Sequence, residues 1–219
     1  MHLGIIMDGN RRWAKSHALE TIFGHHNGVN TLDKLLEVCP KYGINIITVY
    51  VLSTENFAKR SPLEINHLVD VISNAAVSYK EKLLGKNVRV RVLGELSKAP
   101  QKLKDSLFQL VDETKGCTKS LLQLCINYGG RSEIIRAIQK TIASGQAVTE
   151  ETITSNLDSG LEPDLIIRPG GHKRLSNFLL WQGAYSELYF TDTLWPDFDE
   201  KELRKALEFY QNQERKFGK

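Results

Sequence analysis

Segments with the periodicity of β-strands alternate along the whole chain with segments of helical periodicity. The clearest strand candidate covers residues 44–52, where nearly every residue of INIITVYVL is apolar or β-branched. Such a run is typical of a strand that is buried on both faces of a parallel sheet. Residues 65–83 instead carry apolar side chains at the spacing of one helical face. The alternation predicts an α/β fold with a mostly parallel sheet and right-handed crossovers.

The expected boundaries follow from the periodicity and from the turn residues that flank each segment. We expect strands over residues 3–7, 44–52, 88–93, 121–127, 165–168 and 187–190. We expect helices over residues 29–39, 65–83, 98–113, 132–143, 175–182 and 199–217. The polar residues 144–160 are expected to form a mobile insertion. The sequence has no internal repeat and no low-complexity stretch, so we expect residues 1–219 to form a single domain.

Composition narrows the possible functions. The 219 residues are 41% apolar and 25% charged, and the formal net charge is +3. The lysines and arginines are spread rather than clustered, which argues against a nucleic-acid partner. The apolar run at the start is too short for a secretory signal, and no window approaches the roughly 18 apolar residues of a membrane span. The three cysteines form neither a CxxC pair nor a zinc spacing. We therefore expect a cytoplasmic protein with reduced thiols.

Polar residues gather where the predicted strands end. They occupy residues 8–12, 53–56, 127–131 and 168–177, which follow the first, second, fourth and fifth strands. Ligands of parallel α/β sheets bind beyond the carboxyl ends of the strands, where helix N-termini offer free N–H groups. Four such loops at one edge of the sheet would form an anion-binding site.

The loop after the first strand combines a carboxylate with two arginines. Gly9 would let the backbone approach a ligand closely, and Arg11 and Arg12 offer planar recognition of phosphate oxygens. Asp8 among these groups suits Mg²⁺ bridging to a diphosphate. The structural alternative is a turn in which Asp8 caps a helix and the arginines are solvated.

Two further loops contain candidate binding groups. Residues 168–177 read RPGGHKRLSN, which fits a phosphate cradle but lacks the Walker A spacing. The alternative there is a basic surface loop with Ser176 as a helix cap. Residues 53–57, with Arg60 and Glu64, form a polar cluster that could equally be a helix cap. His25 alone is more often structural than catalytic.

The apolar helical stripe over residues 65–83 has two interpretations that can both hold. One is an ordinary face packed against the core. The other is a wall of a hydrophobic tunnel that holds a growing lipid chain.

Together these segments resemble the undecaprenyl diphosphate synthase family, the cis-prenyltransferases. The resemblance rests on IIMDGNRRWAK, FGHHNG, STENF with its trailing Glu, NYGGRSEI, and IRPGGHKRLSNFLLWQGAYSELYFTDTLWPDF, which occur in the order of the family and span nearly the whole chain. It implies a central, mostly parallel six-stranded sheet surrounded by helices, a hydrophobic tunnel, a homodimer and a requirement for Mg²⁺. It also implies a reaction in which isopentenyl diphosphate lengthens an allylic diphosphate, usually farnesyl diphosphate. The expected product is a long-chain polyprenyl diphosphate such as undecaprenyl diphosphate, the lipid carrier precursor for cell-wall glycan synthesis.

The resemblance also assigns roles to single residues. It implies that Asp8 and Glu187 bind Mg²⁺. It places Asp8, Asn10, His25 and Asn56 at the reacting atoms. The residues implied in substrate binding are Gly9, Asn10, Arg11, Arg12, Trp13, His25, Ser53, Thr54, Glu55, Phe57, Arg60, Arg168, Arg174 and Ser176.

The chain departs from the family pattern at several positions. Thr21 stands where the family usually has Arg, His172 replaces the usual Glu, and Pro169 replaces Thr or Val. Phe57 stands where Trp is common. These changes concern the diphosphate contacts and leave the Asp8 loop in place, so the sequence predicts an active enzyme.

Other functions stay open at this point. A short-chain cis-prenyl diphosphate synthase would use the same residues. A non-catalytic subunit of a heteromeric prenyltransferase would keep the fold, although we expect such a subunit to lack the Asp8 loop. A generic phosphate-binding α/β module is the third alternative. A trans-type synthase is disfavoured because the chain has no DDxxD motif. A lipid product would make peripheral contact with a membrane plausible.

Overall fold

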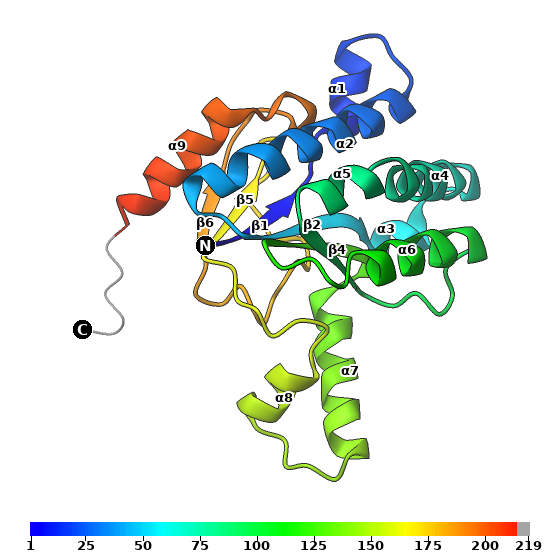
Figure 1. Cartoon of the computed structure of the whole chain (residues 1–219), viewed down its shortest axis with the longest axis vertical. Helices are drawn as coiled ribbons and strands as arrows, with labels where there is room; N and C mark the ends of the chain where they lie inside the picture. The colour runs from blue at the N-terminus through cyan, green and yellow to red at the C-terminus, as the bar shows by residue number, and fades with distance from the viewer. Residues whose placement is uncertain (214–219) are drawn as a thin grey trace.

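A six-stranded sheet runs through the centre of the molecule, and every pair of neighbouring strands is parallel. We describe it from a computed structural model that covers residues 1–213 (Figure 1). The strands are β1 (His2–Ile6), β2 (Ile46–Ser53), β3 (Val88–Leu93), β4 (Ser120–Tyr128), β5 (Leu165–Arg168) and β6 (Glu187–Phe190), in the order β3-β4-β2-β1-β5-β6. All six predicted strands are confirmed, and the sheet is wholly parallel.

Helices connect the strands and cover the sheet. They are α1 (Asn10–Ser16), α2 (Thr21–Val38), α3 (Thr54–Lys59), α4 (Pro62–Ser78), α5 (Lys80–Gly85), α6 (Gln101–Glu113), α7 (Gly130–Ala143), α8 (Glu150–Asn156) and α9 (Glu200–Gln211). Two short 3₁₀ segments, Cys39–Tyr42 and Trp195–Asp197, complete the connections. In Figure 1, α2, α4, α5 and α6 lie above the sheet, whereas α7 and α8 extend away from it below.

Alternate strand residues build a core on each face of the sheet. Leu3 and Ile5 of β1 pack with α2, α6 and α9 in the larger core. Ile6 points the other way and packs with Tyr50 and Phe178 in a smaller core. Successive residues of a strand point to opposite faces of the sheet. A strand between two apolar cores therefore needs a nearly continuous apolar run, which is the pattern that residues 44–52 show.

The predicted helix over residues 175–182 is wrong. This segment forms a series of turns that covers the smaller core. Ser176, Asn177 and Leu179 all have positive φ angles, which right-handed helix excludes. Buried Phe178 stacks on Tyr50 with their ring centroids 4.9 Å apart. Tertiary packing therefore overrides the local apolar pattern of this segment.

Three other predicted segments differ from the structure or extend beyond it. The helix expected over 65–83 begins at Pro62 and is interrupted at Tyr79, which separates α4 from α5. Residues 144–160, expected to be a mobile insertion, contain α8, whose start is fixed by a capping box between Thr149 and Thr152. The last helix is α9, and residues 214–217 of its predicted range lie outside the described residues.

Within residues 1–213, no helix combines the length and the hydropathy that crossing a bilayer requires. Cys39 and Cys125 are buried and Cys117 is partly exposed, and all three are free thiols. The cysteines thus serve as small side chains, as the sequence predicted.

Candidate active site at the carboxyl edge of the sheet

The four polar loops meet at the carboxyl edge of the sheet. β1 and β5 are neighbours in the sheet, and the connection after β1 leads to β2 on one side whereas the connection after β5 leads to β6 on the other. Such a switch point opens a crevice between neighbouring loops. Asp8 after β1 accepts a hydrogen bond from Arg168 at the end of β5, with 2.8 Å between Oδ2 and Nη2. Asn177 joins the other two loops, because its Nδ2 donates to Glu55 and its carbonyl accepts from Gly130.

Asp8 is held by three basic side chains. Its Oδ2 lies 2.8 Å from Arg168 and 3.2 Å from His172 Nδ1, and its Oδ1 lies 3.1 Å from Arg12. Burial raises the pKa of Asp8, but the hydrogen bonds and charges of Arg168 and Arg12 outweigh burial and hold it below its ordinary value. Asp8 is therefore an ionised carboxylate at neutral pH, and its side chain is still partly exposed to a ligand.

Arg168 anchors the loop that follows β5. Its side chain is buried, its Nη1 donates to Ser176 Oγ at 2.8 Å, and the same nitrogen donates to the carbonyl of Arg174. Its Nε has no partner within the described chain. Buried polar groups are nearly always paired. This free donor beside Asp8 is therefore available for an oxygen of a bound anion.

Two glycines let the loops approach each other. Gly9 has a φ of 113° where α1 begins, and Gly170 has a φ of 88° in the loop after β5. Other residues rarely adopt these angles. A Cβ at Gly170 would also lie 2.6 Å from Arg12 Nη2. A side chain there would push the basic loop away from Asp8 and Arg12.

His25 and the residues around it form the other side of the site. Arg11 pairs with Glu64 at 3.4 Å, which joins α1 to the first turn of α4. Burial lowers the pKa of His25 to about 4, and the charges of Arg60 and Arg11 act in the same direction. His25 is therefore neutral near pH 7 and can accept a hydrogen bond through an unprotonated ring nitrogen.

Asn10 lies between the loop that carries Asp8 and the apolar interior. Its Nδ2 donates to the carbonyl of Met7 at 3.3 Å, and its buried Oδ1 has no partner within residues 1–213. Gly28 lies beside that oxygen, since a Cβ there would approach it to 2.5 Å. Asn10 thus offers a second unpaired polar atom close to the site.

The loop after β2 is built as a helix start. Ser53 caps α3 by accepting from the backbone of Asn56 at 3.0 Å, so the capping interpretation of this segment holds for Ser53. Glu55 accepts from Asn177 at 2.8 Å, and Thr54 lies within 3.3 Å of Glu55. Asn56 is exposed, and Phe57 is partly exposed.

Three predicted residues lie apart from this cluster. Arg174 shares its loop with Arg168 but is exposed, and only its carbonyl takes part in the contacts above. Trp13 turns toward the C-terminal part of the chain, where its Nε1 donates to Asp197 at 2.7 Å. Glu187 begins β6 and pairs in register with Leu165, which in turn pairs with Leu3. Since Asp8 lies beyond the opposite end of β1, roughly 15 Å of strand separates the levels of the two carboxylates. One chain therefore does not bring Glu187 to Asp8.

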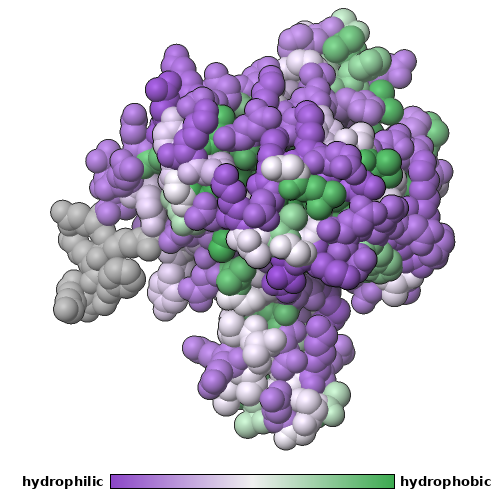
Figure 2. Space-filling model, in the orientation of Figure 1, coloured by the Kyte–Doolittle hydropathy of each residue, from purple (hydrophilic) through white to green (hydrophobic). Residues whose placement is uncertain are grey.

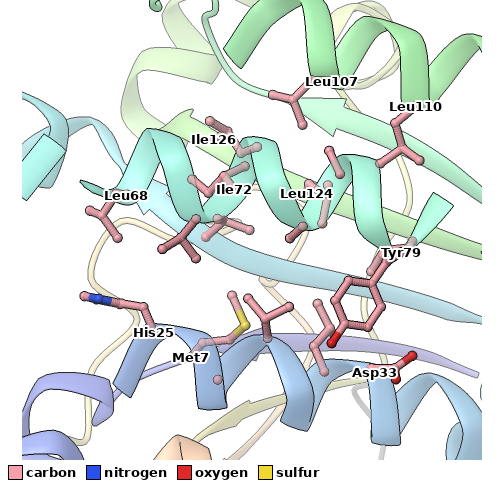
Figure 3. A pocket seen from close by; sticks show the side chains of 18 of the residues that line it. Met7, His25, Asp33, Leu68, Ile72, Tyr79, Leu107, Leu110, Leu124 and Ile126 are labelled. Carbon is pink, nitrogen blue, oxygen red and sulfur yellow. The ribbon is translucent and has the colours of Figure 1, made fainter. Parts of the chain in front are cut away.

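An apolar cavity adjoins the site between α2, α4 and the sheet (Figure 3). The empty volume of the cavity is about 920 Å³, and this figure includes space at its mouth that is open to solvent. His25 marks one end and Tyr79 the other (Figure 3). Met7 and Asn10, which flank Asp8, line the cavity too, so it reaches the loop that carries the carboxylate. Other wall residues are Val29, Leu32 and Leu36 of α2, Leu68, Ile72 and Ala75 of α4, and Val51, Leu124 and Ile126 of the sheet.

Polar side chains close the far end of the cavity. Asp33 pairs with Lys82 and Lys86, each at 3.0 Å, and Tyr79 donates to Asn30 at 2.9 Å. Neither this cluster nor the role of α2 as a wall was predicted from the sequence. The apolar stripe of α2 was visible, but nothing in the sequence showed that it faces α4 across a cavity.

The residues present fit a Mg²⁺ ion that is shared with a substrate. Mg²⁺ is commonly bound by one or two carboxylates together with phosphate oxygens and water. Asp8 is ionised, partly exposed and next to cations that suit phosphates. Residues 1–213 contain no group of three or more His, Cys, Asp and Glu that could hold a metal by themselves. Most ligands of such an ion would come from the substrate.

Comparisons with known proteins find relatives over nearly the whole chain. Residues 6–218 match the family model described as "Putative undecaprenyl diphosphate synthase". The isoprenyl transferase of Fusobacterium nucleatum is 44% identical, over 99% of this chain and 95% of that protein. The isoprenyl transferase of Campylobacter jejuni is 40% identical, over 100% and 98%.

Solved structures show the same likeness. A crystal structure titled as a probable undecaprenyl diphosphate synthase from Campylobacter jejuni has a TM-score of 0.87 and 38% identity, over 100% of this chain and 98% of that one. Lavandulyl diphosphate synthase from Lavandula x intermedia, in complex with dimethylallyl diphosphate, has a TM-score of 0.94 and 33% identity over the same shares.

Proposed function

The chain belongs to the undecaprenyl diphosphate synthase family of isoprenyl transferases, and from this premise we propose that it condenses isopentenyl diphosphate with an allylic diphosphate, usually farnesyl diphosphate. The proposed product is a long-chain polyprenyl diphosphate such as undecaprenyl diphosphate. The proposal rests on one observation: a charged site and an apolar cavity adjoin each other. A cluster of cations around Asp8 opens directly onto an apolar cavity through Met7 and Asn10. A molecule with a diphosphate head and a hydrocarbon tail matches both.

The head of the allylic substrate would lie against the loop after β1. Arg11, Arg12 and the backbone after Gly9 would hold its phosphate oxygens, with its tail between α2 and α4. Arg168 and Ser176, with Arg174 moved inward, would hold the diphosphate of isopentenyl diphosphate. The two substrates would then meet between Asp8 and Asn10, with their carbon ends toward the cavity.

The reaction forms a bond between C4 of isopentenyl diphosphate and C1 of the allylic substrate, while the allylic C1–O bond breaks and a proton leaves C2. Developing charge on the departing diphosphate is stabilised by fixed cations that need no reorganisation. Mg²⁺ bound at Asp8 would supply further neutralisation of that charge. The proton would pass to an oxygen of the released diphosphate, and neutral His25 and the amide of Asn56 are the candidates for orienting that transfer. Each cycle would push the tail deeper into the cavity.

A homodimer is part of the proposal, because Glu187 does not reach Asp8 within one chain. A metal role for Glu187 therefore requires a second copy. Glu187 lies on β6, the edge strand of the sheet, next to the exposed Tyr185. An edge strand is open to another chain. Peripheral contact with a membrane, where the lipid product would be released, is also part of the proposal.

The test is incorporation of labelled isopentenyl diphosphate into extractable lipid in the presence of Mg²⁺, with farnesyl diphosphate or dimethylallyl diphosphate as primer. We expect wild-type protein to make polyprenyl diphosphate. We expect Asp8→Asn to reduce the rate by about 1,000-fold, because it removes the ionised carboxylate at the centre of the charge cluster. Asp105→Asn, on the exposed face of α6, serves as the control and should match wild type. No incorporation with either primer would contradict the proposal.

A further inference from the structure

His172 contacts Asp8 from the loop that follows β5. Its Nδ1 lies 3.2 Å from Asp8 Oδ2, and the two side chains are 40% and 25% exposed. His172 stands where the family usually has Glu, so this contact is a feature of this chain. Arg168 and Arg12 also contact Asp8, but a guanidinium offers only donors and cannot bind a cation. A ring nitrogen of a neutral imidazole can bind one.

Two hydrogen bonds of the backbone fix the turn that presents His172. Gly170 N donates to the carbonyl of Thr193 and Gly171 N donates to that of Thr191, each at 2.8 Å. Both glycines have positive φ angles, 88° and 76°. Because such angles are readily open only to glycine, the chain can turn sharply just before His172. The backbone therefore fixes the position of the imidazole.

The hydrogen bonding of His172 Nδ1 is poor on both sides. Ionised Asp8 can only accept, so its contact needs a proton on Nδ1, and 3.2 Å is longer than the usual value of about 2.9 Å. Arg12 Nη2 can only donate, so its contact at 3.5 Å needs a lone pair on the same nitrogen. One tautomer cannot satisfy both partners. A cation between Nδ1 and Oδ2 would instead use a lone pair of each atom.

The spacing of these two atoms suits a pair of neighbouring metal ligands. Small divalent metal ions bind nitrogen and oxygen ligands at about 2.1 Å. At that bond length, neighbouring ligands lie about 3.0 Å apart in an octahedron and about 3.4 Å apart in a tetrahedron. The 3.2 Å between His172 Nδ1 and Asp8 Oδ2 falls between these two values. The pair can therefore bind one ion with little movement of either side chain.

The surrounding charges require that the ion bind together with a diphosphate. Arg12 and Arg168 lie against Asp8, and their guanidinium groups repel a bare cation. In the proposed function Arg12 holds phosphate oxygens, which would draw it away from Asp8 and His172. The diphosphate would offset the charges of the arginines and, with water, supply the further ligands of the ion.

We propose that His172 Nδ1 and Asp8 Oδ2 together bind the divalent ion of the diphosphate complex, so that the ion has one nitrogen ligand. The inference rests on the proposed function, because the diphosphate supplies the remaining charge. Oxygen ligands suit Mg²⁺, whereas imidazole suits ions such as Ni²⁺ and Zn²⁺. His172 would therefore raise the preference of this chain for a transition-metal ion over Mg²⁺.

The test is pulsed electron paramagnetic resonance of Mn²⁺ bound to the full chain with inorganic diphosphate. Labelling the histidines with ¹⁵N separates their nitrogens from those of the nearby arginines. We expect wild-type protein to show coupling of Mn²⁺ to a directly bound histidine, and His172→Gln to lose it. His172→Glu, which restores the residue usual in the family, should lose it too and serves if the Gln variant misfolds. Absence of the coupling in wild type, or its persistence in these variants, would overturn the proposal.

A comparison of affinities tests the predicted preference. Equilibrium dialysis with inorganic diphosphate gives the dissociation constants of Ni²⁺ and Mg²⁺ for each protein. We expect His172→Gln to weaken Ni²⁺ binding by about 100-fold, at the upper end of the cost of losing an outer partner of a metal site. Mg²⁺ binding should weaken by less than about three-fold, because water readily takes the place of the lost ligand. An equal change for both ions would contradict the proposal.

The matched control is His67→Gln, which removes an exposed histidine of α4. Exposed polar groups can bind ions weakly, and hydrophilic residues cover most of the face shown in Figure 2. The control should keep both the coupling and the Ni²⁺ affinity of wild type. Loss of either would show an adventitious surface site and overturn the proposal.

The incorporation assay with Mg²⁺, run on the same preparations, separates this inference from the proposed function. Active enzyme without coupling to histidine removes the inference alone. Coupling to His172 without any incorporation removes the proposed function and leaves the metal site.

Discussion

At the scale of single residues, the site depends on how Arg168 divides its hydrogen bonds. One nitrogen of its guanidinium donates to Asp8 and the other to Ser176, each at 2.8 Å. A lysine carries one compact charge and cannot hold both partners in a plane. The buried arginine thus fixes the carboxylate and the basic loop relative to each other.

Arg168→Lys should therefore reduce the rate of isopentenyl diphosphate incorporation by about 100-fold, since small displacements of reacting groups have costs of this order. Arg204→Lys, on the exposed face of α9, is the matched control and should keep wild-type kinetics. Steady-state kinetics with both substrates would measure the effect. An Arg168→Lys enzyme as active as Arg204→Lys would show that the two hydrogen bonds of Arg168 do not matter for the rate.

A second prediction at this scale concerns His2, a buried residue of β1. Burial lowers its pKa from 6.5 to about 4. Between these pH values the unfolded chain binds a proton that the folded chain does not, so acid favours unfolding. The contribution to the free energy of unfolding is full above pH 6.5 and falls by about 3 kcal/mol as the pH drops through 4.

Chemical denaturation from pH 7 to pH 4 tests this prediction with wild type and His2→Gln. The difference in unfolding free energy between the two proteins should shift by about 3 kcal/mol over that range, to the disadvantage of wild type in acid. His25 titrates in both proteins and cancels in the comparison. Parallel stability curves would argue that His2 keeps an ordinary pKa in the folded state.

At the scale of elements, the cavity is set by the faces that α2 and α4 turn toward each other. Ala75 of α4 lines the cavity, whereas Val77, two residues on, is exposed. Small side chains such as Ala75 leave the space that the proposed tail would occupy. Polar pairs at Asp33 and Tyr79 then close the far end.

Ala75→Phe should shorten the product, because the added ring fills the path of the tail. Val77→Phe adds the same ring to the outside of the same helix and should leave product length unchanged. Chromatographic sizing of the dephosphorylated lipids measures both. Equal product lengths in the two variants would place the growing chain outside this cavity.

The elements also show what could be predicted from sequence. The hydrophobic periodicity and the flanking turn residues predicted all six strands. The signal is strongest at 44–52, because a strand of a parallel sheet that is buried on both faces is apolar along its whole length. The helix expected at 175–182 does not form, because its apolar residues pack from turns with positive φ angles. Contacts with Tyr50 and Glu55, which lie far away in the chain, stabilise these turns. The site was likewise predictable only in part. The positions of the loops after the strands predicted that Asp8 and Arg168 lie at one edge of the sheet, but not that α2 and α4 face each other across a cavity.

At the scale of the whole molecule, the distance between Asp8 and Glu187 gives a test of assembly. If Glu187 acts on the Asp8 of a second copy, Asp8→Asn and Glu187→Gln chains should complement each other. Random mixing makes half of the dimers mixed, each with one intact site, so about one quarter of wild-type activity should return. Activity of the mixture no higher than that of its parents would exclude a shared site.

In the proposed complex, the Asp8 cluster holds a diphosphate while the cavity between α2 and α4 holds its hydrocarbon tail. A crystal structure with farnesyl thiodiphosphate, an unreactive analogue, and Mg²⁺ would show both parts at once. We expect the diphosphate against Asp8, Arg11 and Arg12, with the tail running past His25 toward Tyr79. A tail lying outside this cavity, or a diphosphate bound away from Asp8, would contradict it.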